Sequence, residues 1–243
     1  MNELLIYFSY INRGDNYKIF KDLVNKKRVE ESNIQQVLNN LKREGVKYIT
    51  VFDDEYPQAL KALKYAPYVI YYKGNLDILN KNLICLTGDI NNNDTDKFIE
   101  KSIDNFSKNF ALITTDFSQM DRNIAKYFRQ NNNQILHILA SGHSYLSPNV
   151  NIENELYISQ YPPQVNPKLQ RFKERNILTA AIGKHLVIYG SKEGSGIINL
   201  AYSFTDFGKN VYCYPSTNLE DGNNFLLKNG ANLITHIADL VTY

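Results

Sequence analysis

The chain has 243 residues, of which 43% are hydrophobic and 21% are charged, and its formal net charge is +2. This length is enough to bury the core of one large domain, and the composition excludes global disorder. A net charge of +2 does not identify a nucleic-acid-binding protein by itself, so any electrostatic footprint has to be local.

Residues 1–44 are predicted to be helical. Ser32 is expected to cap a helix that carries apolar residues at helical spacing, and Gly45 is expected to end it. We interpret 1–44 as a small helical lead-in that packs against a larger domain, residues 45–243. The N-terminus lacks a positively charged region followed by a cleavage site, so no secretory signal is predicted.

From Val46 onwards, short β-like segments alternate with helical ones. The predicted strands are 48–52, 68–72, 83–87, 110–114, 135–139, 156–159, 185–189, 210–214 and 232–235. The predicted helices are 94–108, 119–131, 174–182, 195–207 and 222–229. This alternation predicts an α/β fold with a Rossmann-like, doubly wound and mostly parallel sheet. In such sheets ligands bind beyond the carboxyl ends of the strands, where the strand order reverses.

No cofactor, metal ion or disulfide is expected. Cys85 and Cys213 each lie inside an apolar β-like segment, and we predict that they are buried free thiols in a reducing compartment. The four histidines are scattered and give no metal-ligand spacing with the cysteines. No apolar stretch approaches the roughly 18 residues of a membrane span. We therefore expect a cytoplasmic protein without a membrane partner.

A basic segment that contains an aromatic residue, KLQRFKER, lies between two predicted strands and is interpreted as a loop. Four of its eight residues are basic, and Phe172 lies among them. Cations beside a flat ring suit a polyanion that also offers rings, which points to single-stranded nucleic acid. The alternatives are a solvated charged face and a core position for Phe172. The basic residues of this segment are Lys168, Arg171, Lys173 and Arg175.

Individual roles follow from the chemistry of these side chains. Arg175 can donate two parallel hydrogen bonds to a phosphate, and Phe172 can stack on a base. Asn176 can bond a base edge or, alternatively, the neighbouring backbone. Ser195 and Gly196 precede a helical segment, and the N–H groups at a helix start attract anions; the alternative is a plain helix start.

Six sequence fragments follow one another in a consistent order. They are ITVFDDEYPQALKALKYAPYVIYYKGNLDIL, LYISQYPP, FKERNILTAAI, SGIINLA, GKNVYCYP and DGNNFLLKNGANLI. From about residue 46 to the C-terminus, this series resembles the DNA-processing protein A (DprA/Smf) family, which protects incoming single-stranded DNA and loads RecA onto it. The resemblance implies a non-catalytic single-stranded-DNA-binding protein. It also implies a homodimer that works with a RecA-type recombinase in natural transformation or recombination.

The sequence departs from the family pattern at several positions. A Thr-Gly-Asp turn stands where the family has Gly-Ser-Arg: Gly88 still permits close backbone approach, but Asp89 would repel a phosphate. Asp121 keeps its place, whereas Ala125 stands where the family has a histidine and Ile177 where it has an arginine. These differences indicate a diverged and minimal member.

An alternative function belongs to a different class. Related Rossmann-like folds bind nucleotides at the same strand ends, so a nucleotide-binding sensor or a hydrolase of nucleotide derivatives is the second hypothesis. The chain lacks a G-x-S-x-G elbow and a Walker lysine, and it has no recognisable acid/base pair beside a glycine turn. We therefore expect that the protein is not an enzyme.

Overall fold

The protein is described by a computed structural model that covers residues 2–146, 151–216, 218 and 221–240. The chain divides into two compact units. The first comprises Met1–Leu76 and Ile138–Phe172, and the second comprises Asp77–His137 and Lys173–Tyr243. The boundary predicted after residue 44 therefore lies inside the first unit.

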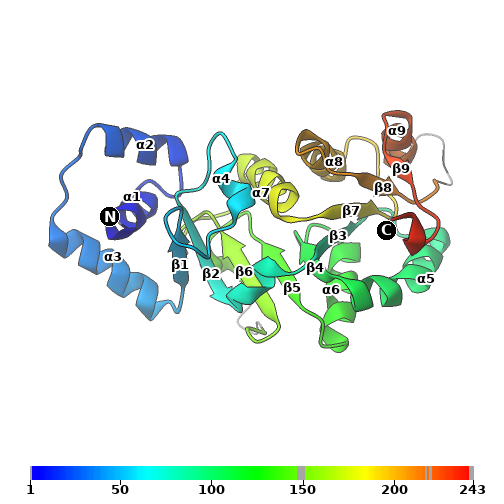
Figure 1. Ribbon diagram of the computed structural model, residues 1–243, viewed down its shortest axis with the longest axis horizontal. Coiled ribbons are helices and arrows are strands. Elements are labelled where there is room, and N and C mark those ends of the chain that lie inside the picture. The colour runs from blue at the N-terminus through cyan, green and yellow to red at the C-terminus, as the bar shows by residue number, and fades with distance from the viewer. Residues whose placement is uncertain (1, 147–150, 217, 219–220, 241–243) are drawn as a thin grey trace. The chain divides into compact units, whose positions relative to one another are not determined.

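The first unit combines N-terminal helices with antiparallel strands (Figure 1). Its strands pair in the order β1-β2-β6, with Ile49 opposite Ile70 and Tyr72 opposite Ile158. The helices are α1 (Asn2–Ile11), α2 (Asn16–Val24), α3 (Glu31–Arg43) and α4 (Gln58–Lys61), with a 3₁₀ turn at His143–Tyr145. The strands are β1 (Lys47–Thr50), β2 (Val69–Gly74) and β6 (Glu155–Ser159).

The helices α1 and α3 pack on this small sheet through one apolar cluster. Leu5 from α1 and Leu41 from α3 meet Val69 and Tyr71 of β2, and all four side chains are buried. The Tyr71 hydroxyl donates to Ser9 Oγ at 3.0 Å, so this buried polar group is satisfied. Residues 1–44 therefore share a core with β1 and β2.

The boundaries of α3 differ slightly from those predicted. Gly45 follows the helix with a φ of +61°, as expected of a residue that ends a helix. Glu30 occupies the N-cap position predicted for Ser32, so the helix starts two residues earlier. Glutamate is a good helix former at the first turn, where its charge also complements the helix dipole.

The second unit is a parallel sheet with the strand order β5-β4-β3-β7-β8-β9. Its strands are β3 (Leu83–Thr87), β4 (Ala111–Thr114), β5 (Ile135–Ile138), β7 (His185–Ile188), β8 (Val211–Cys213) and β9 (Asn232–Leu233). Its helices are α5 (Asn93–Asn109), α6 (Gln119–Gln130), α8 (Gly196–Asp206) and α9 (Gly222–Lys228). Short 3₁₀ segments span Leu76–Asn80 at the unit boundary and Ile237–Asp239 near the C-terminus.

Helices cover both faces of this sheet: α5 and α6 lie on one side, and α8 and α9 on the other (Figure 1). Every residue of β3, β4 and β5 is buried, as parallel strands between two helical layers require. From β3 the chain winds outward to β4 and β5, and from β7 it winds the other way to β8 and β9. The strand order therefore reverses between β3 and β7, and this is the doubly wound, Rossmann-like fold that the sequence predicts.

Each of the nine predicted strand segments overlaps a strand, and the five predicted helices overlap α5 to α9. One interpretation was wrong: the segment KLQRFKER is helical from Leu169, because α7 (Leu169–Ile182) begins there and runs from the first unit into the second. Leu, Gln, Arg, Lys and Glu are strong helix formers, which the loop interpretation overlooked. Cys85 and Cys213 are buried and free, as predicted. None of the described helices combines the length and apolar character that crossing a membrane needs.

His143 is a buried titratable residue of the first unit. Its Nε2 donates to the carbonyl oxygen of Tyr157 at 2.9 Å, while no partner of its Nδ1 is found among the described residues. Burial, with a smaller contribution from the charge of Lys73, lowers the pKa of His143 from 6.5 to about 4. Below pH 6.5 the unfolded chain therefore binds a proton that the folded chain does not, and stability falls as the pH drops toward 4.

We expect His143→Gln to reduce this acid sensitivity, because glutamine keeps an N–H donor for Tyr157 and does not titrate. Between about pH 7.5 and 5 the wild type should lose on the order of 2 kcal/mol more free energy of unfolding than the variant. Urea titrations at both pH values measure the difference. His185, whose pKa burial also lowers to about 4, titrates in both proteins and cancels. Equal losses would show that His143 titrates normally in the folded chain.

Candidate functional site at the strand-order reversal

The loops after β3 and β7 touch each other at the point where the strand order reverses. The amide of Asp89 donates to the carbonyl oxygen of Gly190 at 2.9 Å. A Cβ atom at Gly88 would lie 2.9 Å from that carbonyl oxygen and would also clash with Met120, so only glycine fits there. Gly88 is thus placed at the predicted edge, where it lets the two loops approach closely.

The Asp89 carboxylate binds the backbone of the neighbouring loop. Its Oδ1 accepts from the amide of Lys192 at 2.8 Å. An acid at this position therefore occupies a backbone donor that could otherwise face an anion, and it adds a negative charge to the edge. The carboxylate that is predicted to repel a phosphate therefore lies at the junction of the β3 and β7 loops.

A buried carboxylate, that of Asp121, holds the β3 and β4 ends against α6. Asp121 is 2% exposed and accepts from Thr87 Oγ1 at 2.7 Å and from Ser118 Oγ at 2.9 Å. The backbone amide of Phe117 donates to its other oxygen at 3.0 Å. Burial raises the pKa of Asp121 above its ordinary value, while the hydrogen bonds from Thr87 and Ser118 oppose that rise.

The side chain of Arg175 lies inside the second unit instead of at the surface position that the sequence predicted. It is 6% exposed; Nη1 donates to the carbonyl oxygen of Thr115 at 3.2 Å, and Nη2 donates to Asn176 Oδ1 at 3.3 Å. Burial lowers the pKa of Arg175 to about 10, and the nearby charge of Asp121 opposes this. The guanidinium thus organises the β4 loop, and its role as a phosphate ligand stays a prediction.

Asn176 links α7 to the start of α8. Its Nδ2 donates to Asn199 Oδ1 at 3.0 Å and to the carbonyl oxygen of Gly196 at 3.4 Å. Ser195 caps α8 by accepting from the amide of Ile197 at 3.2 Å. The structure therefore brings Asn176, Ser195 and Gly196 together, and it gives Asn176 the backbone-bonding role that the sequence left as an alternative.

Phe117 is an aromatic residue at this edge that the sequence reasoning missed. It follows β4, its side chain is 45% exposed, and a Cβ atom at Gly196 would lie 3.6 Å from its ring. The next acid along the edge is Asp116, whose Oδ2 lies 2.7 Å from Nδ1 of the buried His137. An aromatic residue in the loop that follows an apolar strand is the sequence signal that could have indicated Phe117.

The remaining predicted residues lie at the start of α7: Lys168 directly precedes the helix, and the other three lie on its first two turns. Lys173 belongs to the second unit and is exposed. Lys168 and Phe172 belong to the first unit and are also exposed, Phe172 by 38%. Arg171 is half-buried: its guanidinium bonds Asn166 and lies 5.0 Å from the centre of the Tyr161 ring. Of these four, Lys168, Phe172 and Lys173 are accessible to a ligand.

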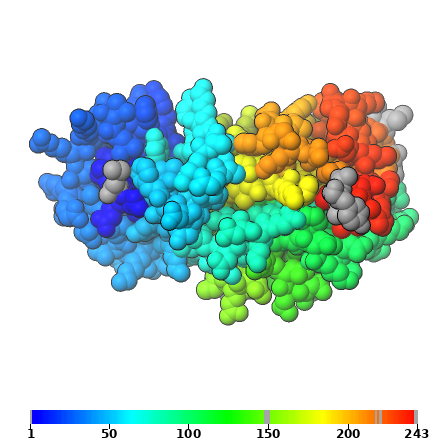
Figure 2. All heavy atoms as spheres, viewed as in Figure 1, coloured from blue at the N-terminus to red at the C-terminus, as the bar shows by residue number. Residues whose placement is uncertain are grey.

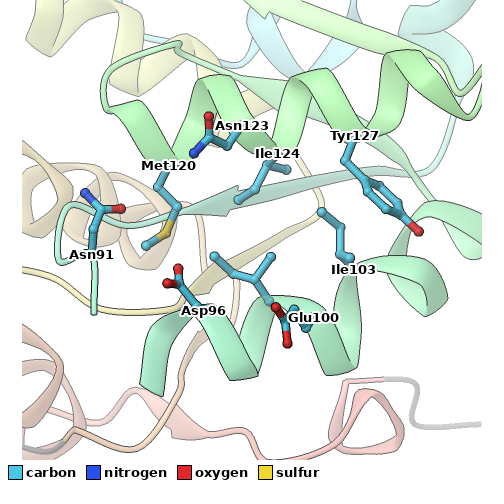
Figure 3. A pocket seen from close by; sticks show the side chains of 9 residues that line it. Asn91, Asp96, Glu100, Ile103, Met120, Asn123, Ile124 and Tyr127 are labelled. Carbon is cyan, nitrogen blue, oxygen red and sulfur yellow. The ribbon is translucent and has the colours of Figure 1, made fainter. Parts of the chain in front are cut away.

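A groove of about 330 Å³ lies between α5 and α6 (Figure 3). The apolar side chains of Met120 and Ile124 line its α6 side, and the carboxylates of Asp96 and Glu100 line its α5 side. Two carboxylates repel phosphates, so this groove does not suit a polyanion. Within the described part of the chain, no three His, Cys, Asp or Glu side chains are placed to hold a metal ion.

The fold and this edge together define a class: a Rossmann-like protein with its candidate ligand site at the strand-order reversal. The family model for DNA recombination-mediator protein A matches residues 47–243, which is most of the chain. The chain therefore belongs to that family, and the resemblance read from the sequence is confirmed.

Individual relatives are distant. The chain is 25% identical to DNA processing protein DprA of Streptococcus pneumoniae over 203 residues, which cover 79% of this chain and 72% of that protein. It is 21% identical to the Bacillus subtilis protein of the same name over 220 residues, covering 85% and 74% respectively.

Two solved structures have the same fold. The structure of DNA processing protein A from S. pneumoniae matches with a TM-score of 0.75 at 21% identity, covering 99% of this chain and 92% of that one. The structure from Helicobacter pylori, described as showing a single-stranded-DNA binding mode, matches with a TM-score of 0.68 at 20% identity. It covers 80% of this chain and 94% of that one.

We expect Asp121→Ala to lower the free energy of unfolding by about 3 kcal/mol, because two buried hydroxyl groups and one backbone amide lose their acceptor and the buried Arg175 loses a nearby opposite charge. Urea titration measures the loss. The matched control is Asp104→Ala, which removes an acid whose pair with Lys108 is solvent-exposed and should leave stability almost unchanged. Similar effects of both substitutions would show that the Asp121 hydrogen bonds do not hold this edge together.

Proposed function

We propose that this chain binds single-stranded DNA without catalysing a reaction on it. The proposal takes the activity of its family, including the single-strand binding described for the H. pylori relative, as the activity of this chain. It also includes a homodimer in the cytoplasm that hands DNA to a RecA-type recombinase during natural transformation or recombination. The observation that carries the proposal is an exposed cation at the edge where Rossmann-like proteins bind ligands.

That cation is Lys173. It is exposed on α7 three residues before Asn176, which bonds the first residue of α8. Lys168, directly before α7, and Phe172, on its first turn, are also exposed, so they offer a second charge and a flat ring. Lysine contacts with phosphate supply affinity without sequence preference, and aromatic stacking adds roughly 1–3 kcal/mol per base.

The acids at the edge set a limit on this binding. Asp89 and Asp116 both lie beyond strand ends of the second unit. A phosphate backbone that passes the β3–β7 junction meets the charge of Asp89. We infer that this chain binds DNA more weakly at that junction than a relative with arginine there, and that α7 provides more of the affinity.

We expect Lys173→Ala to weaken oligo-dT binding several-fold and to reduce the slope of log K against log salt by about 0.7. Phe172→Ala should weaken binding with little change of slope, because stacking does not release counterions. Fluorescence anisotropy of labelled oligo-dT over a series of salt concentrations measures both quantities.

The control is Lys101→Ala, which removes an exposed lysine from α5, on the opposite face of the sheet from α8. It should bind like the wild type. Equal binding by all four proteins would remove α7 from the site. If the wild type binds no oligo-dT at low salt but binds a mononucleotide tightly, the nucleotide-sensor alternative replaces this proposal.

We expect Asp89→Asn to tighten oligo-dT binding about five-fold at low salt, because it removes a negative charge that costs on the order of 1 kcal/mol near a phosphate. Asparagine retains an oxygen that can accept from the Lys192 amide, so the loop geometry is preserved. High salt should abolish the gain. Unchanged binding at low salt would show that the strand does not pass the β3–β7 junction.

A further inference from the structure

The strongest concentration of positive charge in the chain lies in the first unit, outside the site described above. Residues 16–28 contain five basic residues and one acidic residue, a net charge of +4, although the whole chain carries only +2. The remaining residues therefore sum to −2. The basic residues of this segment are Lys18, Lys21, Lys26, Lys27 and Arg28.

An exposed apolar stripe runs along α2 in the same segment. Tyr17, Phe20 and Val24 are 56%, 49% and 61% exposed. Their spacing of three and four residues places them on one face of the helix. We call these three residues the α2 stripe. Figure 1 shows α2 at the upper edge of the N-terminal helices. In Figure 2 the blue atoms of these helices are visible at the surface in that region.

Other residues in and beside α2 hold the helix in place, so the stripe is not needed for packing. Ile19 is fully buried. Asn16 Oδ1 accepts from the amide of Tyr68 at 3.3 Å, and Asn12 Nδ2 donates to Asp22 at 2.8 Å. Truncating a side chain of the α2 stripe should therefore leave these contacts intact.

The charges lie beside the rings. Lys21 Nζ is 4.6 Å from the centre of the Tyr17 ring, in a cation–π contact. Lys18 and Lys27 pair with Asp15 and Asp22. Among the described residues, Lys26 and Arg28 have no acidic partner within salt-bridge distance, so their charges remain available. These two residues lie two and four positions beyond Val24, the last residue of the helix.

We propose that the α2 stripe and its cations form a second binding surface for single-stranded DNA. Flat rings stack on bases of any sequence, and neighbouring cations neutralise the phosphates between those bases. This inference rests on the proposed function, which it extends by adding a separate contact in the first unit.

A single-stranded polynucleotide fits this surface better than a lipid bilayer does. Helix α2 has nine residues, and two of the three side chains in its stripe are aromatic. A membrane-surface helix keeps its cations on the face opposite its apolar side chains. Here Lys21 lies on the same face as the rings, next to Phe20.

The chain contains no tryptophan, so Phe20→Trp creates a single tryptophan reporter on the stripe. Stacking of a base on that indole should quench its emission by roughly half at saturating oligo-dT. The matched control is Phe52→Trp, because Phe52 is 58% exposed in the same unit but is followed by Asp53, Asp54 and Glu55. Its emission should not change.

A second variant measures the contribution to affinity. Phe20→Ala should weaken oligo-dT binding about five-fold or more, whereas Phe52→Ala should bind like the wild type. Both positions are solvent-exposed, and circular dichroism checks that the variants fold.

Three outcomes would overturn the inference. If the wild type binds oligo-dT but Trp at position 20 is not quenched, or if Phe20→Ala binds normally, the second surface is wrong and the proposed function stands. If the wild type binds no oligo-dT, both fail. If the emission shifts to shorter wavelength with phosphatidylglycerol vesicles and is not quenched by oligo-dT, the stripe is a lipid-binding surface.

Discussion

The arrangement of the candidate site depends on one buried carboxylate. Asp121 accepts hydrogen bonds from the end of β3, from the loop after β4 and from the N-cap of α6. Arg175 then connects the same loop to α7, and Asn176 connects α7 to α8. Because buried polar groups are costly when unsatisfied, these contacts hold the edge in one arrangement. The buried side chains of Asp121 and Arg175 thus fix the loops at the edge of the sheet without being exposed there themselves.

This arrangement changes which residues bear on ligand binding. Arg175 has the right chemistry for a phosphate but lies in the interior. Asp89 has the wrong charge, and its carboxylate is committed to the backbone of the β7 loop. Affinity for a polyanion must then come from exposed cations elsewhere. Lys173 on α7 and the basic residues in and after α2 are such cations.

The groove between α5 and α6 carries negative charge, in contrast to the basic segment around α2. Asp96 and Glu100 make that part of the second unit unsuitable for phosphates. A net charge of +2 for the whole chain therefore hides regions of opposite sign. Local charge, and not the total, decides where a polynucleotide could bind.

The sequence by itself determined the order and type of nearly every element, because buried strands such as LICLT and amphipathic helices such as α6 have strong local patterns. It also determined the family, through motifs kept in order along the chain. Only the tertiary structure decided that Arg175 is buried, that Asp89 bonds the Lys192 amide and that Phe117 lies against the start of α8. The reason is physical: periodicity reports which face of an element is apolar, but the partner of a polar side chain is set by residues that folding brings close from distant parts of the chain.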